Sequence, residues 1–291
     1  MWTPRLEIPI FGPASASPAV SLGAARLELN AAGSYPLGGT TPSASELGDT
    51  AAAAALAGSS SSPAASATLR VMIRPRGPPA DGSPDFLYAS GELAEMREAI
   101  VGFGRSGLLD PERGDGFVFG VLRRAGGGGG GVVVDVERNA ELVRLAWPFK
   151  CVFHRAFDDV VGSVARLGQG GGDGQHQTTT EVWKAALEDV IDCGFSGVLT
   201  SGGPGTAPGN ALVLNGIVAG AKERIEVVVG GGVRSTNVRD LALAIRHDTS
   251  PVWFHSSCLT SKDGGEEVDG EEVRYISREL GLLQGEGSKS K

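Results

Sequence analysis

Short apolar runs rich in valine, isoleucine, leucine and phenylalanine recur along the chain, and longer segments with helical periodicity separate them. Most of these runs are apolar almost without interruption, which is typical of strands that are covered on both faces. Eight runs predict strands, at residues 6–11, 26–31, 69–76, 117–122, 149–157, 197–203, 225–233 and 251–258.

Between the predicted strands, apolar residues recur at intervals of three and four, which predicts amphipathic helices. Ser90 is a suitable N-cap for the first clear stripe, and Ser235 begins the capping run of a later one. Clear stripes occupy residues 93–100, 136–147, 182–193, 214–221, 238–245 and 273–283. We also expect helices at 13–22, which is short, and at 43–57, which is rich in alanine but lacks an apolar stripe.

A strand followed by a helix, repeated eight times, is typical of a parallel α/β architecture. Eight repeats favour a closed (β/α)₈ TIM-like barrel over an open sheet. We therefore expect a single barrel domain over residues 5–283.

Low-complexity segments interrupt this pattern. They are too polar or too rich in glycine to bury enough apolar surface to offset the entropy of ordering them. We expect disordered insertions at about 57–67, 124–132 and 166–180, and a disordered tail at 284–291.

Composition narrows the function. Of the 291 residues 41% are hydrophobic, which suffices for a large core, and the net charge of −8 argues against nucleic acid as a partner. Cys151, Cys193 and Cys258 include no C-x-x-C pair, so neither a disulfide framework nor a thiolate zinc site is indicated. No signal peptide and no apolar run of membrane-spanning length is found. We expect a cytoplasmic location away from the membrane, with the nucleus left open.

Polar residues gather where the predicted strands end. In a (β/α)₈ barrel the chemistry lies at the carboxyl ends of the strands. The polar and glycine residues at these ends are Glu7, Glu28, Asn30, Arg74, Arg76, His154, Arg155, Asp158, Thr200, Ser201, Gly230, Gly231, Gly232, His255 and Ser256.

Alternation along the strands gives these residues a common direction. Glu28 and Asn30 face one way, towards the barrel axis, whereas Leu27 and Leu29 face the helices. Charges at the axis must be paired, so structural pairing and ligand contact remain equally open for the two glutamates. Arg74, Arg76 and His154 gather at the catalytic face of the barrel, which favours a functional site over structural pairing for these three residues.

His154 and His255 are two of only four histidines. Either can transfer protons near neutral pH. Either can also bind a metal, but the sequence offers no clear third ligand, so the metal stays unknown.

The segment VVGGGVRS, at residues 228–235, is the second candidate feature. Three glycines after a strand let backbone N–H groups approach a ligand closely, and the N-terminus of the following helix points to the same place. The alternative is a tight turn that needs glycine for its geometry alone. The position in the barrel modestly favours an anion site.

Several of these strings resemble the CutC copper-homeostasis family. RLELN, GGTTPS, MIRPRG, FLYASGE, VFGVL, FHRAFD, VLTSGG, VVGGGV and FHSS occur in that family's order across about residues 5–258. The resemblance, to a fungal-type or eukaryotic-type member with low-complexity insertions, implies a cytosolic TIM-like barrel, often a homo-oligomer, proposed to bind or traffic copper. It also implies a shared set of site residues: Glu7, Glu28, Arg74, Arg76, His154, Arg155, Asp158, Ser201 and His255.

The sequence departs from the family where copper ligands are expected. Members usually carry a cysteine just after the first-strand glutamate and another two residues after the second-strand glutamate. Here these places hold Pro9 and Ile10, and Asn30. Cu(I) prefers thiolate and thioether ligands, so the cofactor is left unknown, with copper implied by the resemblance.

Two functions therefore remain open, and whether the protein is an enzyme is undecided. One is a copper-homeostasis protein that binds or traffics copper. The other is a barrel enzyme of lyase or isomerase type that acts on a small anionic or phosphorylated metabolite. For the second, the predicted catalytic residues are His154, Asp158, Glu28 and Glu7. The predicted ligand-binding residues are Arg74, Arg76, Arg155, Thr200, Ser201, Gly230, Gly231, Gly232, His255 and Ser256.

Overall fold

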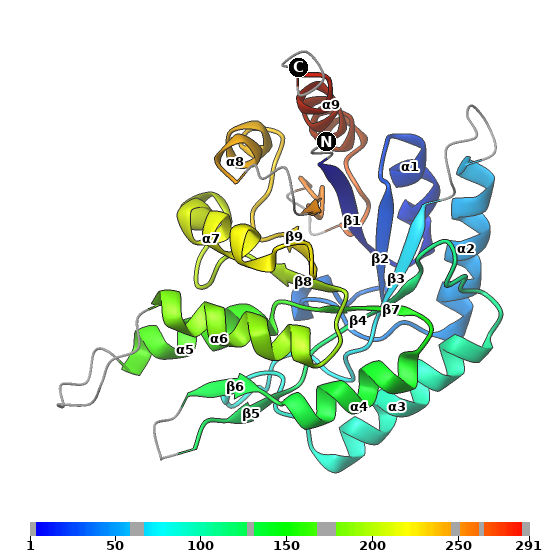
Figure 1. Ribbon diagram of the computed structural model, residues 1–291. Coiled ribbons are helices and arrows are strands. Elements are labelled where there is room, and N and C mark those ends of the chain that lie inside the picture. The colour runs from blue at the N-terminus through cyan, green and yellow to red at the C-terminus, as the bar shows by residue number, and fades with distance from the viewer. Residues whose placement is uncertain are drawn as a thin grey trace.

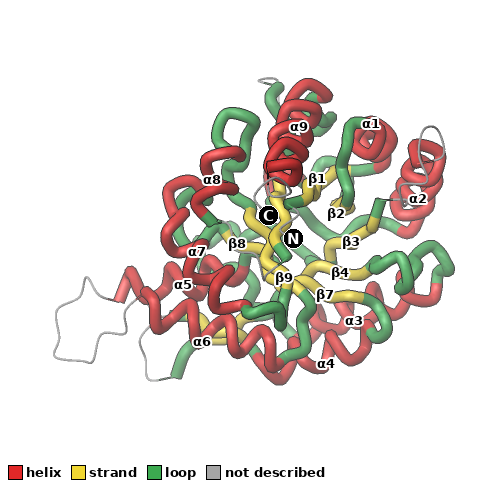
Figure 2. Tube along the Cα trace, turned by 45° about the horizontal axis from the view of Figure 1, so that its top comes forward, coloured by secondary structure: helices red, strands yellow, loops and turns green. Residues whose placement is uncertain are grey.

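The computed structural model describes residues 4–58, 67–126, 131–167, 179–245, 251–261 and 265–286. Eight parallel strands close into a barrel, and helices surround them (Figures 1 and 2). The barrel strands are β1 (Arg5–Phe11), β2 (Arg26–Asn30), β3 (Thr68–Met72), β4 (Gly116–Phe119), β7 (Lys150–Phe153), β8 (Gly197–Thr200), β9 (Glu226–Val229) and β10 (Val252–His255). The (β/α)₈ barrel predicted from the sequence is confirmed.

The order around the barrel is β1-β10-β9-β8-β7-β4-β3-β2, and β2 closes the ring by pairing with β1. The helices are α1 (Ala16–Ser21), α2 (Ala44–Gly58), α3 (Ser90–Arg105), α4 (Val136–Ala146), α5 (Ala156–Leu167), α6 (Thr179–Asp192), α7 (Ala211–Ala221), α8 (Val238–Ala244) and α9 (Gly270–Glu286). Short 3₁₀ helices lie at Pro13–Ser15, Tyr35–Leu37 and Pro208–Asn210. Every predicted helix is present, including the two without a clear stripe.

Strand residues alternate between two apolar layers, as the sequence predicts. Leu27 and Leu29 of β2 are fully buried in the main core cluster, together with residues of the helices. A separate cluster of strand residues forms an inner layer: Met72, Val118, Val152, Leu199, Val228 and Trp253. Polar residues flank this layer along the same strands at a spacing of two: Arg70 precedes Met72, Glu226 precedes Val228, and His255 follows Trp253.

The strand predicted at residues 149–157 is shorter than expected. β7 ends at Phe153, and α5, which the sequence analysis missed, begins at Ala156. Phe157, Val160 and Val161 are buried on α5. Because aromatic and β-branched residues are also typical of strands, this stretch resembles a continuation of the strand before it.

Two other strand predictions also need correction. β3 ends at Met72, so Arg74 and Arg76 follow the strand and the alternation rule does not fix their directions. The run at 117–122 contains both the end of β4 and the start of β5 (Leu122–Arg124), which pairs antiparallel with β6 (Val132–Val134).

The predicted insertions are only partly covered. The ends of the 124–132 segment belong to the β5–β6 hairpin, while residues 127–130, 59–66 and 168–178 lie outside the described residues. Residues 284–286 of the expected tail are helical, because α9 continues to Glu286. The predicted capping residue Ser235 is not the N-cap of α8, which is Asn237; Ser235 instead donates its hydroxyl hydrogen to Glu272.

Candidate functional site

A cavity of about 490 Å³ opens where the barrel strands end. Most of the residues predicted for the site line it, although they come from strands and loops far apart in the sequence. Those that line it are Glu28, Arg74, His154, Arg155, Asp158, Thr200, Ser201, Gly230, Gly231, Gly232 and His255.

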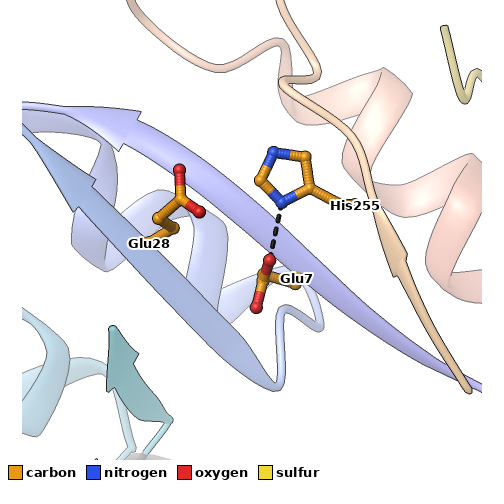
Figure 3. A group of neighbouring side chains, drawn as sticks. All are labelled: Glu7, Glu28 and His255. Carbon is orange, nitrogen blue, oxygen red and sulfur yellow. Dashed lines mark hydrogen bonds and ion pairs between the residues drawn. The ribbon is translucent and has the colours of Figure 1, made fainter. Parts of the chain in front are cut away.

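At the floor of the cavity, His255 is linked to Glu7, which lies behind it. Nδ1 of His255 lies 2.6 Å from Oε1 of Glu7 (Figure 3). Arg26 donates from Nε to the other carboxylate oxygen of Glu7. Burial works to raise the pKa of Glu7, but the charges and hydrogen bonds of Arg26 and His255 prevail and lower it to about 2. Glu7 is therefore ionised, and the Nδ1–H of His255 donates to it.

Burial disfavours a charged imidazole at His255, but two carboxylates oppose this effect. The charge of Glu28, and then the hydrogen bond and charge of Glu7, raise the pKa of His255 above its ordinary value. Because Nδ1 is held by Glu7, Nε2 is the nitrogen that remains for a ligand.

Glu28 is the least compensated charge of the floor. Asn30 donates from Nδ2 to Oε1 of Glu28 over 3.3 Å, but Oε2 is buried with no hydrogen-bond partner among the described residues. Burial raises the pKa of Glu28, the charge of His255 lowers it, and the net shift is upward. A buried carboxylate oxygen without a donor costs stability unless a ligand supplies a partner.

Glu7, Glu28 and His255 together form a potential metal site. One ligand atom from each lies within 4.8 Å of the others, and the Glu28 carboxylate is turned towards the imidazole (Figure 3). His154, the other histidine considered as a metal ligand, is not a member of this group. Imidazole and carboxylate suit a divalent ion of borderline character, such as Cu²⁺ or Zn²⁺.

Below the floor, an ion-pair network closes the barrel interior. Arg26 donates from Nη1 to Glu226 over 2.7 Å, and Arg70 lies 3.8 Å from the same carboxylate oxygen. The Arg26 guanidinium also lies 3.8 Å from the ring centroid of Trp253. Arg26, Arg70 and Glu226 were not among the residues predicted from the sequence, although Arg26 shares its strand face with Glu28.

His154 lies directly after β7, on the wall of the cavity. Its Nδ1 accepts a hydrogen bond from the backbone N–H of Ala156 over 3.3 Å, and its Nε2 is buried without a partner in the described structure. Burial, followed by the charges of Arg74 and Arg155, lowers the pKa of His154 well below its ordinary value. The imidazole is therefore neutral and carries its proton on Nε2.

Asp158 holds the loop after β8. Its carboxylate accepts hydrogen bonds from the hydroxyls of Thr200 and Ser201 and from the backbone N–H groups of Ser201 and Gly203. Burial raises its pKa to about 6, although these donors oppose the shift. Asp158 and His154 were both predicted to be catalytic, but no hydrogen bond joins them among the described residues.

The two arginines after β3 have different environments. Arg74 is buried, donates from Nη1 to the carbonyls of Leu37 and Gly39, and pairs through Nη2 with Asp85 at 2.6 Å. Arg76 pairs with Glu92 and with Asp85 and does not line the cavity. The structure thus brings Arg74 but not Arg76 to the cavity, and ligand binding by either arginine stays a prediction.

Two further predicted residues lie behind the lining. Glu7 reaches the cavity only through His255. The hydroxyl of Ser256 donates to the carbonyl of Val233 over 2.8 Å, which turns it away from the cavity. The glycine run does line the cavity, and Gly231 and Gly232 have φ values of 89° and 82°. The helix after it, however, begins only at Val238 and has seven residues.

At the rim, Arg155 and Arg234 carry charges without carboxylate partners. Neither forms an ion pair among the described residues, and both line the cavity. Arg234, which immediately follows the GGGV segment, was missed by the sequence analysis; its place in the quoted segment VVGGGVRS was the available signal.

Sulfur ligands are scarce at the cavity. Cys151, Cys193 and Cys258 are buried free thiols and none of them lines it. Burial raises the pKa of Cys151 to about 12 and that of Cys258 to about 11, so their thiolate forms are disfavoured. Met72 contributes a thioether to the lining.

Within the described residues, no helix has the length and apolar character needed to cross a membrane.

Comparison with known proteins gives consistent results. The model of the CutC family matches residues 5–170 and 175–252. A family protein CutC of Vibrio vulnificus is 33% identical over 241 residues, covering 82% of this chain and 76% of its own. The copper homeostasis protein cutC homolog of Caenorhabditis elegans is 31% identical over 258 residues, covering 89% of this chain and 82% of its own. The crystal structure of CutC from Streptococcus agalactiae has a TM-score of 0.64 at 22% identity, covering 88% of this chain and 98% of that one.

Proposed function

Because the chain belongs to the CutC family, we propose that it acts in copper homeostasis and binds copper in the cavity at the mouth of its barrel. The proposed ligands are Glu28 and His255, with Glu7 behind them. Copper is the cargo of the protein in this proposal.

The observation that carries the proposal is the unpartnered oxygen of Glu28. Oε2 is buried, and the Glu28 carboxylate lies beside His255, whose Nδ1 is already held by Glu7. A cation between Glu28 and Nε2 of His255 would give both groups a partner. A carboxylate that holds the other nitrogen of a metal-binding histidine orients the ring and strengthens it as a ligand.

The ligand set favours Cu(II) over Cu(I). Cu(I) prefers thiolate and thioether ligands, whereas imidazole and carboxylate suit Cu(II), which such sites hold more tightly than other divalent ions of the first transition row. Pro9 and Asn30 line the cavity where family members usually have cysteine, and Met72 is the remaining sulfur ligand of the lining.

The alternative of lyase or isomerase chemistry gains little support from the site. His154 is neutral, accepts a hydrogen bond from the backbone and has no carboxylate partner among the described residues. Asp158 is occupied by the loop after β8. A catalytic base must lie within hydrogen-bond reach of the proton that it removes, and a second group must orient it.

We place the protein in the cytoplasm, away from nucleic acid and membranes, with copper or a small anion as its ligand. Three cysteines without a disulfide and a net charge of −8 support this placement.

Competition titrations test copper binding. We expect Cu(II) to bind more tightly than Zn(II). The electron spin-echo spectrum of the Cu(II) complex should show coupling to a single imidazole. Glu28→Gln and His255→Phe should each weaken Cu(II) binding by about tenfold or more, because loss of a ligand should cost at least as much as loss of a group that only orients one.

Glu141→Gln is the matched control, because Glu141 pairs with Arg97 on the surface and should not affect copper. The proposal fails if the purified protein cannot compete with a weak Cu(II) chelator, or if Glu28→Gln and Glu141→Gln bind copper equally well.

A further inference from the structure

We propose that the same cavity contains an oxyanion subsite, formed by Nε2–H of His154 and the guanidinium groups of Arg155 and Arg234. Its ligand is the phosphate or carboxylate end of a small molecule. This inference goes beyond copper homeostasis and does not depend on whether copper binds.

The first observation is an unused hydrogen-bond donor. His154 is only 2% exposed, and its Nδ1 accepts from the backbone of Ala156, so the ring proton resides on Nε2. That nitrogen is buried without a partner in the described structure, and the ring lines the cavity. A buried N–H with no acceptor is costly, which indicates that a ligand atom completes the bond.

The second observation is an excess of positive charge beside His154. A Cβ built on Gly38 would lie 3.2 Å from Nη2 of Arg155 and 3.5 Å from Nη1 of Arg74, so the two guanidinium groups are neighbours. Asp85 compensates Arg74 but is shared with Arg76, and no described carboxylate pairs with Arg155. Neighbouring like charges repel unless an anion joins them.

Arg234 supplies positive charge from a different part of the lining. Its Nη1 donates to the carbonyl of Val233 over 2.8 Å and lies 3.4 Å from the hydroxyl of Ser256. These contacts hold the stem of the guanidinium, while Nε and Nη2 make no hydrogen bond to other described residues. A planar guanidinium with free N–H groups matches a carboxylate or phosphate oxygen pair.

Acidic groups of the lining do not neutralise this charge. Glu28 and Asp158 are the carboxylates that line the cavity. Glu28 belongs to the floor with His255, and Asp158 is saturated by the donors of the loop after β8. With about 490 Å³ against roughly 30 Å³ for one water, the cavity has room for a small organic molecule whose anionic end meets the arginines.

The test uses the full-length protein with metal removed by a chelator. Inorganic phosphate and malonate are titrated separately by calorimetry, with chloride at the same ionic strength as the reference. We expect at least one of the two probes to bind, and Arg155→Gln and Arg234→Gln each to weaken it by about tenfold, the effect of one charge-assisted hydrogen bond.

Arg105→Gln is the matched control. Arg105 is an exposed arginine in the last turn of α3, and its replacement should leave anion binding unchanged. Binding should also shift the ¹⁵N resonance of Nε2 of His154, which a purely structural role of the arginines would not produce.

Whichever of the two probes binds identifies the anionic group of the ligand, phosphate or carboxylate. If neither phosphate nor malonate exceeds chloride, or if both arginine variants bind as the Arg105 control does, the subsite does not exist. Because metal is absent throughout, such a failure leaves copper binding untouched, and a failure of copper binding leaves this result untouched.

Discussion

The interior of the barrel contains two polar regions that differ in how their charges are matched. In the lower region, which we call the plug, Arg26 contacts both Glu7 and Glu226, and Arg70 faces Glu226. In the upper region, the mouth, Glu28 retains an unpartnered oxygen and His154 an unpartnered nitrogen.

We interpret this difference as one between charges that stabilise the fold and polar atoms that are left for the proposed ligands. Both regions are buried and both are rich in ionisable groups, so burial and charge alone do not distinguish them. In the plug each of these charges has an opposite charge within 3.8 Å, and the leftover donors are one nitrogen of each guanidinium, Nη2 of Arg26 and Nε of Arg70. At the mouth the unpartnered atom is one of the two carboxylate oxygens of Glu28, and in His154 it is the nitrogen that carries the single N–H donor of the ring.

The largest expected effect comes from breaking the plug. Arg26→Met removes the positive charge between Glu7 and Glu226 while keeping an apolar stem over Trp253. Because Glu7 would remain buried without its guanidinium, we expect a loss of about 3–5 kcal/mol in the free energy of unfolding. Urea denaturation followed by Trp fluorescence measures it.

Arg5→Met is the control for this variant. Arg5 is exposed and lies 5.6 Å from the ring centroid of the same tryptophan, so its loss should cost no more than about 1 kcal/mol. Equal losses for Arg5→Met and Arg26→Met would mean that the plug is not a matched ion network.

Asp158 allows a test at the mouth itself, because it is the carboxylate there that is fully bonded. Burial raises its pKa from 3.8 to about 6. Between these values the unfolded chain has released the proton while the native protein still binds it, so native stability falls as the pH rises. Asp158→Asn lacks this titration, so the stability advantage of the wild type over the variant should shrink by about 1–3 kcal/mol from pH 4 to pH 6.

Chemical denaturation of both proteins across this range measures the difference, and titrations that the two proteins share cancel from it. An advantage that grows with pH would show that the donors of Thr200, Ser201 and Gly203 favour the ionised form, and that Asp158 is a matched charge like those of the plug.

The sequence sufficed for the barrel and for the convergence of the site. The hydrophobic periodicity and the repeated strand–helix unit specify the strands and helices. Because the strands are parallel, their carboxyl ends then meet at one end of the barrel, independently of the loop conformations. For this reason Glu28, His154 and His255 could be assigned to one cavity before the structure was known.

Which charged side chains pair with one another could not be predicted from the sequence in this way. Arg76 was expected at the ligand, but the chain leaves the strand after Met72 and a loop then turns Arg76 to Glu92. Glu7 was predicted to be catalytic, but it contacts Arg26 of the neighbouring strand and lies behind His255. Which charges form pairs depends on how far each side chain reaches across neighbouring strands. The alternation of side chains along one strand does not contain this information.

The smallest effect gives the sharpest comparison, because one substitution is made in each region. Glu28→Gln retains an acceptor for Asn30 and removes a charge whose burial raises its pKa, so we expect the native state to gain about 0.5–2 kcal/mol. Glu226→Gln removes the same charge from the plug, where it compensates Arg26 and Arg70, so it should destabilise by a similar amount. Parallel urea titrations in chelator measure both signs. Opposite signs are expected if Glu28 is an uncompensated buried carboxylate and Glu226 a compensated one. Two losses of equal size would mean that Glu28 is as well matched as Glu226, and the distinction between plug and mouth would fail.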